Sequence, residues 1–323
     1  MAAGTSLRGR LARVRSAEPT LRGRLRRFTV LLWRLTSATT RICLRYRVTG
    51  LAAEAGFFAL LSLPPLVLGL VGALGFIGQE IGADVVADLR AQLRQLTLTF
   101  LTADSVSSVI LPTFDRVVGS GRADVVSIGF LLSLWSGSRA LNVYVDTISI
   151  MYGLGGHRGI VRTRALSFSL YVVILLAGVV VIPLVLIGPS VLGQLLSSAG
   201  LDVLARLASS SYLYWPVVSM VAVAGLSSLY HVATPVRSPW RRDVPGALLA
   251  LGIWVLASFL LRVVIGHSVG GASIYGPLAT PIVVLIWLYF LAIAVLIGAA
   301  LNAAIDERYP TAHRLAARGD QHR

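Results

Sequence analysis

The sequence predicts an all-α membrane protein: a polytopic bundle of six transmembrane helices with the N- and C-termini both cytoplasmic. The first observation is composition, because 56% of the 323 residues are hydrophobic, 13% are charged and the mean hydropathy is +0.78. A soluble protein of this length needs about twice that charged fraction to cover its surface. Six long apolar runs and an alternation of arginine between them are the other two observations. A wholly soluble enzyme is therefore excluded.

Each apolar run is long enough to cross hydrocarbon about 30 Å thick, which takes roughly 20 helical residues. The second run is the weakest span, because it contains Arg139 and Asp146. These runs predict an N-terminal segment (1–49), a six-helix domain (50–305) and a cytoplasmic tail (306–323). The six runs occupy residues 51–78, 125–152, 166–196, 212–232, 244–265 and 278–304.

Successive connections between the apolar runs are alternately rich and poor in arginine. Positive charge is retained on the cytoplasmic side of a membrane. Residues 1–49 carry twelve arginines and one acid, whereas 79–124 carries four arginines and six acids. The connections at 153–165 and 233–243 are basic again. This pattern predicts that the N- and C-termini both face the cytoplasm, with 79–123 as an extracytoplasmic insertion.

The N-terminal segment predicts disorder over 1–20 and a basic amphipathic helix over about 21–48, lying on the inner leaflet. Arginine near an anionic surface contributes about 1 kcal/mol of attraction. We therefore expect membrane lipids, and the anionic inner leaflet in particular, as partners, and no specific nucleic acid. The side chains expected to face lipid are Phe28, Leu31, Leu32 and Leu35.

In the outer insertion, apolar residues recur at spacings of four, four, four and three over 79–98, which predicts a helix. Its place at the outer mouth of the bundle favours an interfacial helix; an ordinary connector without a role in transport is the alternative. The residues of the stripe are Ile81, Val85, Leu89, Leu93 and Leu96.

Composition also excludes several chemistries. All 29 basic residues are arginine, so a P-loop lysine and Schiff-base catalysis are absent. The single Cys43 excludes an internal disulfide and a cysteine-bound cluster. The histidines lack metal-binding spacing, and the one GxSxG string, at 266–270, follows a long apolar helical run and not the strand that a hydrolase elbow needs. We expect no catalytic residues, no metal, no cofactor and no enzyme activity. The histidines are His157, His231, His267, His313 and His322.

Several short strings occur in order along the chain: FFALLSLPP (57–65), WSGSRA (135–140), LYH (229–231), WRRDVPGA (240–247), IYG (274–276) and GAALN (298–302). Together they resemble the YihY/BrkB family of bacterial envelope proteins, some of which were once labelled ribonuclease BN. The resemblance covers about 28–305. It implies an inner-membrane protein connected with envelope integrity, with lipid or lipopolysaccharide export proposed for some members. Ala300 stands where the family often has an acid, and Pro64 where an aromatic residue is usual.

Ionisable residues at membrane depth are candidates for function, because each costs about 2.5–3.5 kcal/mol at a helix centre. Arg139, Asn142 and Asp146 lie three and four residues apart, on one helix face. Arg139 is expected to bind an anionic group on a substrate path; the alternative is a buried ion pair that fixes helix register. Prolines interrupt the first span, as in many transporters. The substrate-path candidates are Glu54, Ser62, Pro64, Pro65, Ser136, Arg139, Asn142 and Asp146.

The favoured function is the movement or handling of an amphipathic anionic envelope molecule, such as a lipid. The alternative is a non-transporting membrane scaffold that supports envelope integrity through protein partners, with a homo-oligomer also open. A nuclease is disfavoured, because the cytoplasmic face is rich in arginine and poor in acidic metal ligands.

Overall fold

The computed structural model describes residues 21–81, 123–198, 210–236, 239–268 and 279–310, together with isolated positions between 90 and 115 and at 200 and 206. Across these ranges all regular structure is helical, which confirms the all-α class. The helices are α2 (Leu21–Arg45), α3 (Val48–Ile81), α7 (Ala123–Met151), α8 (Ile160–Ser198), α10 (Ser211–Ala233), α11 (Val244–Ser268) and α12 (Ala279–Arg308), with a 3-10 turn η3 (Trp240–Arg242).

Five of these helices are long and apolar enough to cross a membrane. Among the described residues, α7 does not reach that hydropathy, because its 29 residues include Arg139 and Asp146. It lies inside the bundle nonetheless, packed between α3 and α8. The five segments are Val48–Val67, Ile160–Gly178, Tyr212–Ala233, Trp240–Val264 and Pro281–Arg308.

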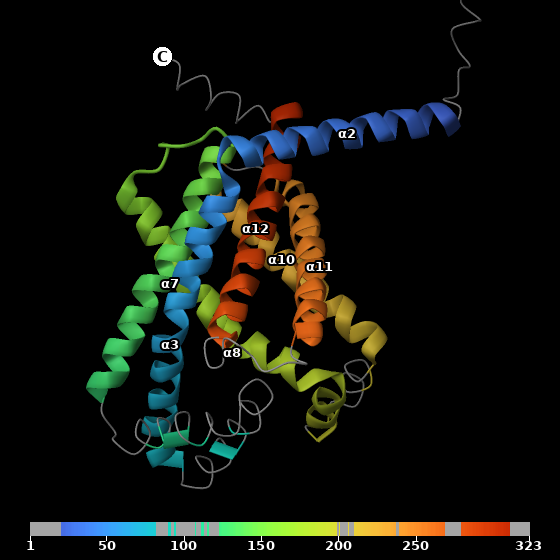
Figure 1. Ribbon diagram of the computed structural model, residues 1–323. Coiled ribbons are helices and arrows are strands. Elements are labelled where there is room, and N and C mark those ends of the chain that lie inside the picture. The colour runs from blue at the N-terminus through green and yellow to red at the C-terminus, as the bar shows by residue number, and fades with distance from the viewer. Residues whose placement is uncertain are drawn as a thin grey trace, which may run out of the picture.

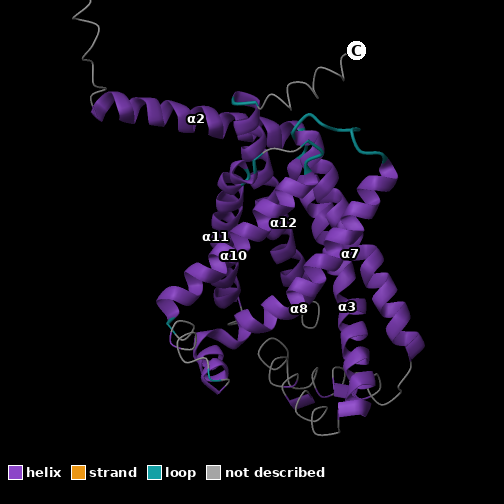
Figure 2. Cartoon of the chain, turned by 180° about the vertical axis from the view of Figure 1, so that it is seen from behind, coloured by secondary structure: helices purple, strands orange, loops and turns teal. Residues whose placement is uncertain are grey.

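Helix α2 lies across one end of the bundle, and the last turns of α12 reach the same end (Figure 1). We call this the α2 end. The chain turns sharply from α2 into α3 at Arg47, whose φ of 51° is in the left-handed region. The reverse view shows α8 running obliquely across the bundle, away from α7 and toward α10 (Figure 2).

Helix α2 occupies most of the range predicted for the amphipathic helix, about 21–48, and ends at Arg45, two residues before that turn. Its last turns bury Thr39 and Ile42, whereas Leu32 and Trp33 are exposed. The expected lipid-facing side chain of Phe28 lies outside the described side chains. Contact of α2 with the inner leaflet stays a prediction.

Most of the expected outer helix over 79–98 lies outside the described residues. A bidentate ion pair joins two described positions of this region, Arg90 and Asp115, with N–O distances of 2.8 and 2.9 Å. The Arg90 guanidinium lowers the pKa of the Asp115 carboxyl through these hydrogen bonds. The pair links parts of the insertion 25 residues apart.

The core lies at the α2 end, where small residues allow helix backbones to approach closely. A Cβ on Gly298 would collide with the Gly246 carbonyl, and a Cβ on Gly56 would lie 3.2 Å from the Tyr289 nitrogen. Small residues at such crossings allow van der Waals packing, which holds helices together in lipid. The buried set includes Ala52 and Ala55 of α3, Ala247 of α11, and Ala292, Ala299, Ala300, Ala303 and Ala304 of α12.

Polar side chains at this end complete the backbone hydrogen bonding. The Asn302 side chain accepts from the Gly246 amide at 2.8 Å and donates to the Asp243 carbonyl at 2.9 Å. The Tyr230 hydroxyl donates to the Val295 carbonyl at 2.8 Å. Because water is absent from hydrocarbon, such bonds fix the start of α11 and the end of α10 against α12.

Arg158, in the loop between α7 and α8, caps the C-terminal end of α10. Its guanidinium donates to the carbonyls of Val232, Ala233 and Thr234 at 3.0–3.1 Å. A cation is favourable there because the last carbonyls carry the negative end of the helix dipole. Partial burial lowers the pKa of Arg158, but a guanidinium remains charged in proteins. The cap ties this loop to α10.

We predict that Gly246→Val destabilises the protein by about 1–3 kcal/mol or more, because the added side chain forces α11 away from α12. Thermal unfolding in detergent measures the effect. Gly252→Val, on the same helix, is the matched control, since no atom lies within 4 Å of a Cβ there. Equal changes for the two variants would contradict the close crossing.

The reactivity of the Cys43 thiol tests whether α2 packs against the rest of the bundle. Cys43 packs against the core, and burial raises the pKa of its thiol. Because the thiolate is the reactive form, alkylation by a neutral maleimide should rise with pH beyond the range of an ordinary cysteine. Thr40→Cys in a Cys43→Ser background is the exposed control on the same helix. Identical pH profiles would mean that α2 is undocked in solution.

Candidate functional site

The candidate site lies between α3 and α7, which run side by side in both views (Figures 1 and 2). Helix α3 packs more extensively against α7 than against any other described helix. The opposite face of α7 rests on α8, where Gly137 leaves space for the Tyr171 ring and the Ser133 and Tyr171 hydroxyls lie 3.0 Å apart. This contact fixes the rotation of α7 and directs Arg139 toward α3.

Arg139 meets two side chains of α3. Its Nη2 lies 3.9 Å from Oε1 of Glu54, and its guanidinium carbon lies 5.2 Å from the centre of the Phe58 ring. The second contact is a cation–π interaction. The Arg139 and Glu54 side chains are 45% and 42% exposed. The cation therefore has a counter-ion, at a distance that leaves hydrogen-bonding capacity free.

Depth along the helices places this pair inside the expected membrane thickness. At 1.5 Å per residue, Arg139 lies about 18 Å from the α2 end of α7 and Glu54 about 9 Å from that end of α3. The long side chains of Arg139 and Glu54 span the difference between these two depths. The sequence placed both groups at membrane depth but left their contact open; the structure brings them together.

The other members of the predicted polar stripe have different surroundings. Ser136 is buried and donates to the Leu132 carbonyl at 3.0 Å. Asn142 faces α8, where its Oδ1 lies 3.5 Å from the Ser167 hydroxyl. Asp146 is exposed, and in the described ranges it forms no ion pair. The stripe is therefore divided between two interfaces, and Arg139 alone of its members meets an acid.

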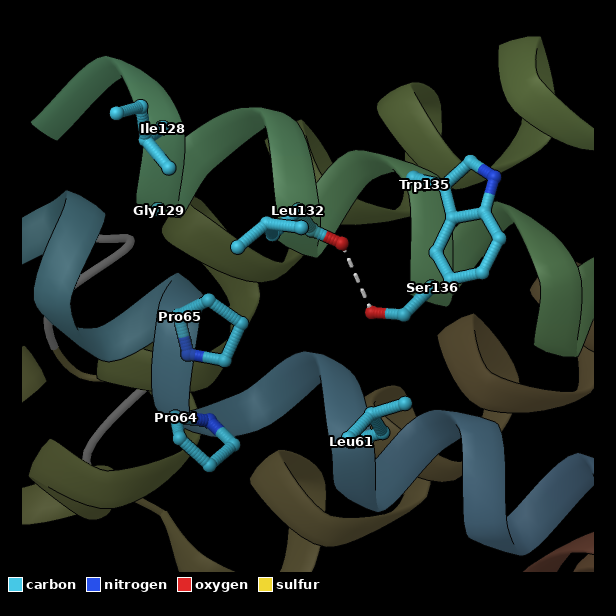
Figure 3. Close-up of a pocket in the computed structure, with 8 residues that line it drawn as sticks. All are labelled: Leu61, Pro64, Pro65, Ile128, Gly129, Leu132, Trp135 and Ser136. Atoms are coloured by element: carbon cyan, nitrogen blue, oxygen red, sulfur yellow. Dashed lines mark hydrogen bonds between the residues drawn. The ribbon is translucent and has the colours of Figure 1, made fainter.

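A hollow of about 550 Å³ opens between the two helices, farther from the α2 end than the ion pair. We call it the α3–α7 groove. Its lining is almost entirely apolar, and Figure 3 shows the α3 and α7 side chains facing each other across it. Leu132 and Trp135 are each more than half exposed, so the groove opens on the side of the bundle. The lining residues are Leu61, Pro64, Pro65, Ile128, Gly129, Leu132, Trp135 and Ser136.

The groove and the charged pair are neighbours along both helices. Leu61 follows Phe58 by three residues on α3, and Trp135 precedes Arg139 by four on α7, which is about one helical turn in each case. Of the predicted candidates, Pro64, Pro65 and Ser136 line the groove. Ser62 does not: it is buried and donates to the Ala59 carbonyl at 2.7 Å.

Sequence reasoning missed the apolar wall, Leu61, Ile128, Leu132 and Trp135. In a membrane helix nearly every residue is apolar, so an apolar lining has no distinguishing pattern. Trp135 had a partial signal, because it begins the WSGSRA string that contains Arg139.

The described residues contain no group of three or more His, Cys, Asp or Glu side chains arranged to hold a metal ion. The nearest approach of such residues is at the α2 end, where His231 Nδ1 lies 3.4 Å from Asp243 Oδ2. Asp243 also accepts from the Tyr152 hydroxyl at 3.4 Å. These groups join α7, α10 and the start of α11.

Comparison with known proteins gives a consistent result. The family model described as Virulence factor BrkB matches residues 41–322. The chain is 24% identical to a Bacillus subtilis protein named as ribonuclease-like, YfkH, over 80% of this chain and 90% of that protein. It is 26% identical to a UPF0761 membrane protein of Pseudoalteromonas translucida over 82% of this chain and 83% of that protein. No solved structure matches with significance.

A longer relative extends the comparison. A UPF0761 membrane protein of Verminephrobacter eiseniae is 27% identical over 88% of this chain but only 64% of its own length. The resemblance inferred from the strings in the sequence is thus confirmed at the level of the family.

We predict that Glu54→Gln destabilises the protein in bicelles by about 1–2 kcal/mol, because Arg139 loses its counter-ion in a medium poor in water. The double variant Glu54→Gln/Arg139→Gln should recover most of this loss. Asp146→Asn is the control, since this acid has no ion pair among the described residues. Equal losses for Glu54→Gln and Asp146→Asn, measured by thermal unfolding, would contradict a specific pair.

Proposed function

Because this chain belongs to the Virulence factor BrkB family, we propose that it is a multi-pass inner-membrane protein that moves an amphipathic anionic envelope molecule, such as a lipid, along the α3–α7 groove. The observation that carries the proposal is the position of a cation at one end of an apolar hollow. Arg139 would bind the anionic group, and the groove would hold the hydrocarbon.

The electrostatics support an anionic head. A guanidinium has five N–H donors, and the single contact with Glu54 at 3.9 Å uses few of them. A phosphate or carboxylate forms short, charge-assisted hydrogen bonds with such a group. Phe58 covers one face of the guanidinium and leaves its edge for the ligand.

The dimensions support an acyl chain. From Arg139 to Ile128, at the far end of the groove, the distance along α7 is about 16 Å, roughly half of the hydrocarbon thickness. Its exposed wall gives access from the bilayer, without passage through water. A head bound at Arg139 would therefore lie well inside the membrane, which is where a lipid that changes leaflet must pass.

Glu54 supplies a means of release. The carboxylate competes with the ligand anion for Arg139, so binding exchanges one counter-ion for another. Such an exchange keeps the Arg139 cation neutralised at every stage, while the displaced Glu54 carboxylate, which is 42% exposed, is taken up by water or by a proton. We propose that Glu54 limits the residence time of the ligand.

The remaining assignments belong to the same proposal. With α7 counted beside the five apolar helices, the bundle has six spans, and the arginine of α2 and of the short loops orients the α2 end toward the cytoplasm. Helix α2 then lies on the anionic inner leaflet. The protein acts without a catalytic centre of its own.

The proposal is tested by reconstitution into liposomes that contain a fluorescent phosphatidylglycerol. We predict that the wild-type protein accelerates exchange between leaflets and that Arg139→Gln lowers the protein-dependent rate about tenfold or more, since a charged hydrogen bond is lost. Arg162→Gln, an exposed arginine at the start of α8, is the control. Each variant is checked for insertion and folding.

Two outcomes would overturn the proposal. Full transport by correctly folded Arg139→Gln would remove the assigned role of the cation. A rate equal to that of empty liposomes, together with retained binding of envelope proteins, would favour the scaffold instead. RNA added to the same purified protein tests the function suggested by the name of the Bacillus relative, through cleavage that follows the protein.

A further inference from the structure

We infer that the ligand of the α3–α7 groove carries hydrogen-bond donors on its head as well as an anion, as phosphatidylglycerol does. This inference rests on the proposed function and names the lipid class for the same site. It follows from the hydrogen-bonding groups around the groove. Backbone carbonyls that lose their N–H donors at Pro64 and Pro65 can accept hydrogen bonds, and a cation lies about one helical turn away.

Pro64 and Pro65 generate two of these acceptors. In an α-helix each carbonyl points toward the residue four positions ahead and bonds to its N–H. Proline has no N–H, so the carbonyls of Leu60 and Leu61 receive no such bond from positions 64 and 65. Helix α3 nevertheless continues through both prolines, from Val48 to Ile81.

The nearest hydroxyl on α3 does not compensate for the missing donors. Ser62 is buried and donates to the Ala59 carbonyl at 2.7 Å, one position before the two affected carbonyls. Leu61, Pro64 and Pro65 all line the groove, so the Leu61 carbonyl, for which both the i+3 and the i+4 position is a proline, lies on the groove face of α3. In hydrocarbon a carbonyl without a donor is costly, and it favours a ligand or water that supplies one.

The α7 wall adds a third acceptor and no nearby donor. The Ser136 hydroxyl gives its proton to the Leu132 carbonyl, and its oxygen keeps an acceptor site (Figure 3). Gly129 brings no side chain to this wall. The indole nitrogen of Trp135 lies on the side of its ring away from Pro64 and Pro65 in the same view.

The spacing suits a single lipid head. Leu61 lies three residues beyond Phe58, about 4.5 Å along α3, and Phe58 contacts Arg139. A phosphate at Arg139 would place the hydroxyls of a glycerol head at the near end of the groove, within reach of the Leu60 and Leu61 carbonyls, with the hydrocarbon along the exposed wall formed by Leu132 and Trp135. Phosphatidic acid, whose head is the phosphate alone, would leave these carbonyls without partners.

The test compares two lipids that share the phosphate. The full-length protein in nanodiscs of phosphatidylcholine is titrated with phosphatidylglycerol or with phosphatidic acid, and bound lipid is measured by native mass spectrometry. We expect wild-type protein to prefer phosphatidylglycerol about tenfold, as for one or two added hydrogen bonds. Pro64→Ala and Pro65→Ala restore an N–H each and should reduce the preference to about twofold, chiefly by weakening phosphatidylglycerol binding.

Two controls separate this inference from the proposed function. Pro216→Ala restores an N–H in α10, away from the groove, and should leave the preference unchanged. Arg139→Gln should weaken both lipids together. No preference in the wild-type protein, or a preference that survives in both groove variants, overturns the inference while binding at Arg139 stands. Undiminished binding of both lipids by Arg139→Gln overturns the proposed function itself.

Discussion

Close contact between helix backbones at the α2 end is the constraint on which the other features depend. Gly246 and Gly298 allow α11 and α12 to cross without intervening side chains, and Gly56 allows the same between α3 and α12. In lipid, helices are held by such packing and by internal hydrogen bonds. With this end fixed, α3 and α7 can present a cation and an apolar groove farther along their length.

Much of the fold is predictable from the sequence, because hydropathy and arginine distribution act over whole helices. The charges that made the run over 125–152 the weakest prediction also keep α7 below the hydropathy of the other spans. Helix ends are less predictable: α8 begins at Ile160, six residues before its apolar run, because backbone hydrogen bonding continues into the polar segment Arg162–Arg164. The expected amphipathic helix is present as α2.

The site is predictable only where a residue is unusual for its surroundings. Glu54 and Arg139 are conspicuous as charges in apolar runs, and Pro64 and Pro65 as prolines within a helix. Their mutual positions depend on helix rotation, which Gly137 and Tyr171 set through a contact on the far side of α7. A spacing rule places Asn142 beside Arg139, but tertiary packing turns it toward Ser167.

The Arg158 cap has a mechanical consequence. By joining the loop after α7 to the last carbonyls of α10, it makes the two segments move as one body at that end. Shearing there would break three hydrogen bonds to a charged group at once. Motion of α7 relative to α10 is therefore most restrained at this end and freer toward the opposite ends of the two helices.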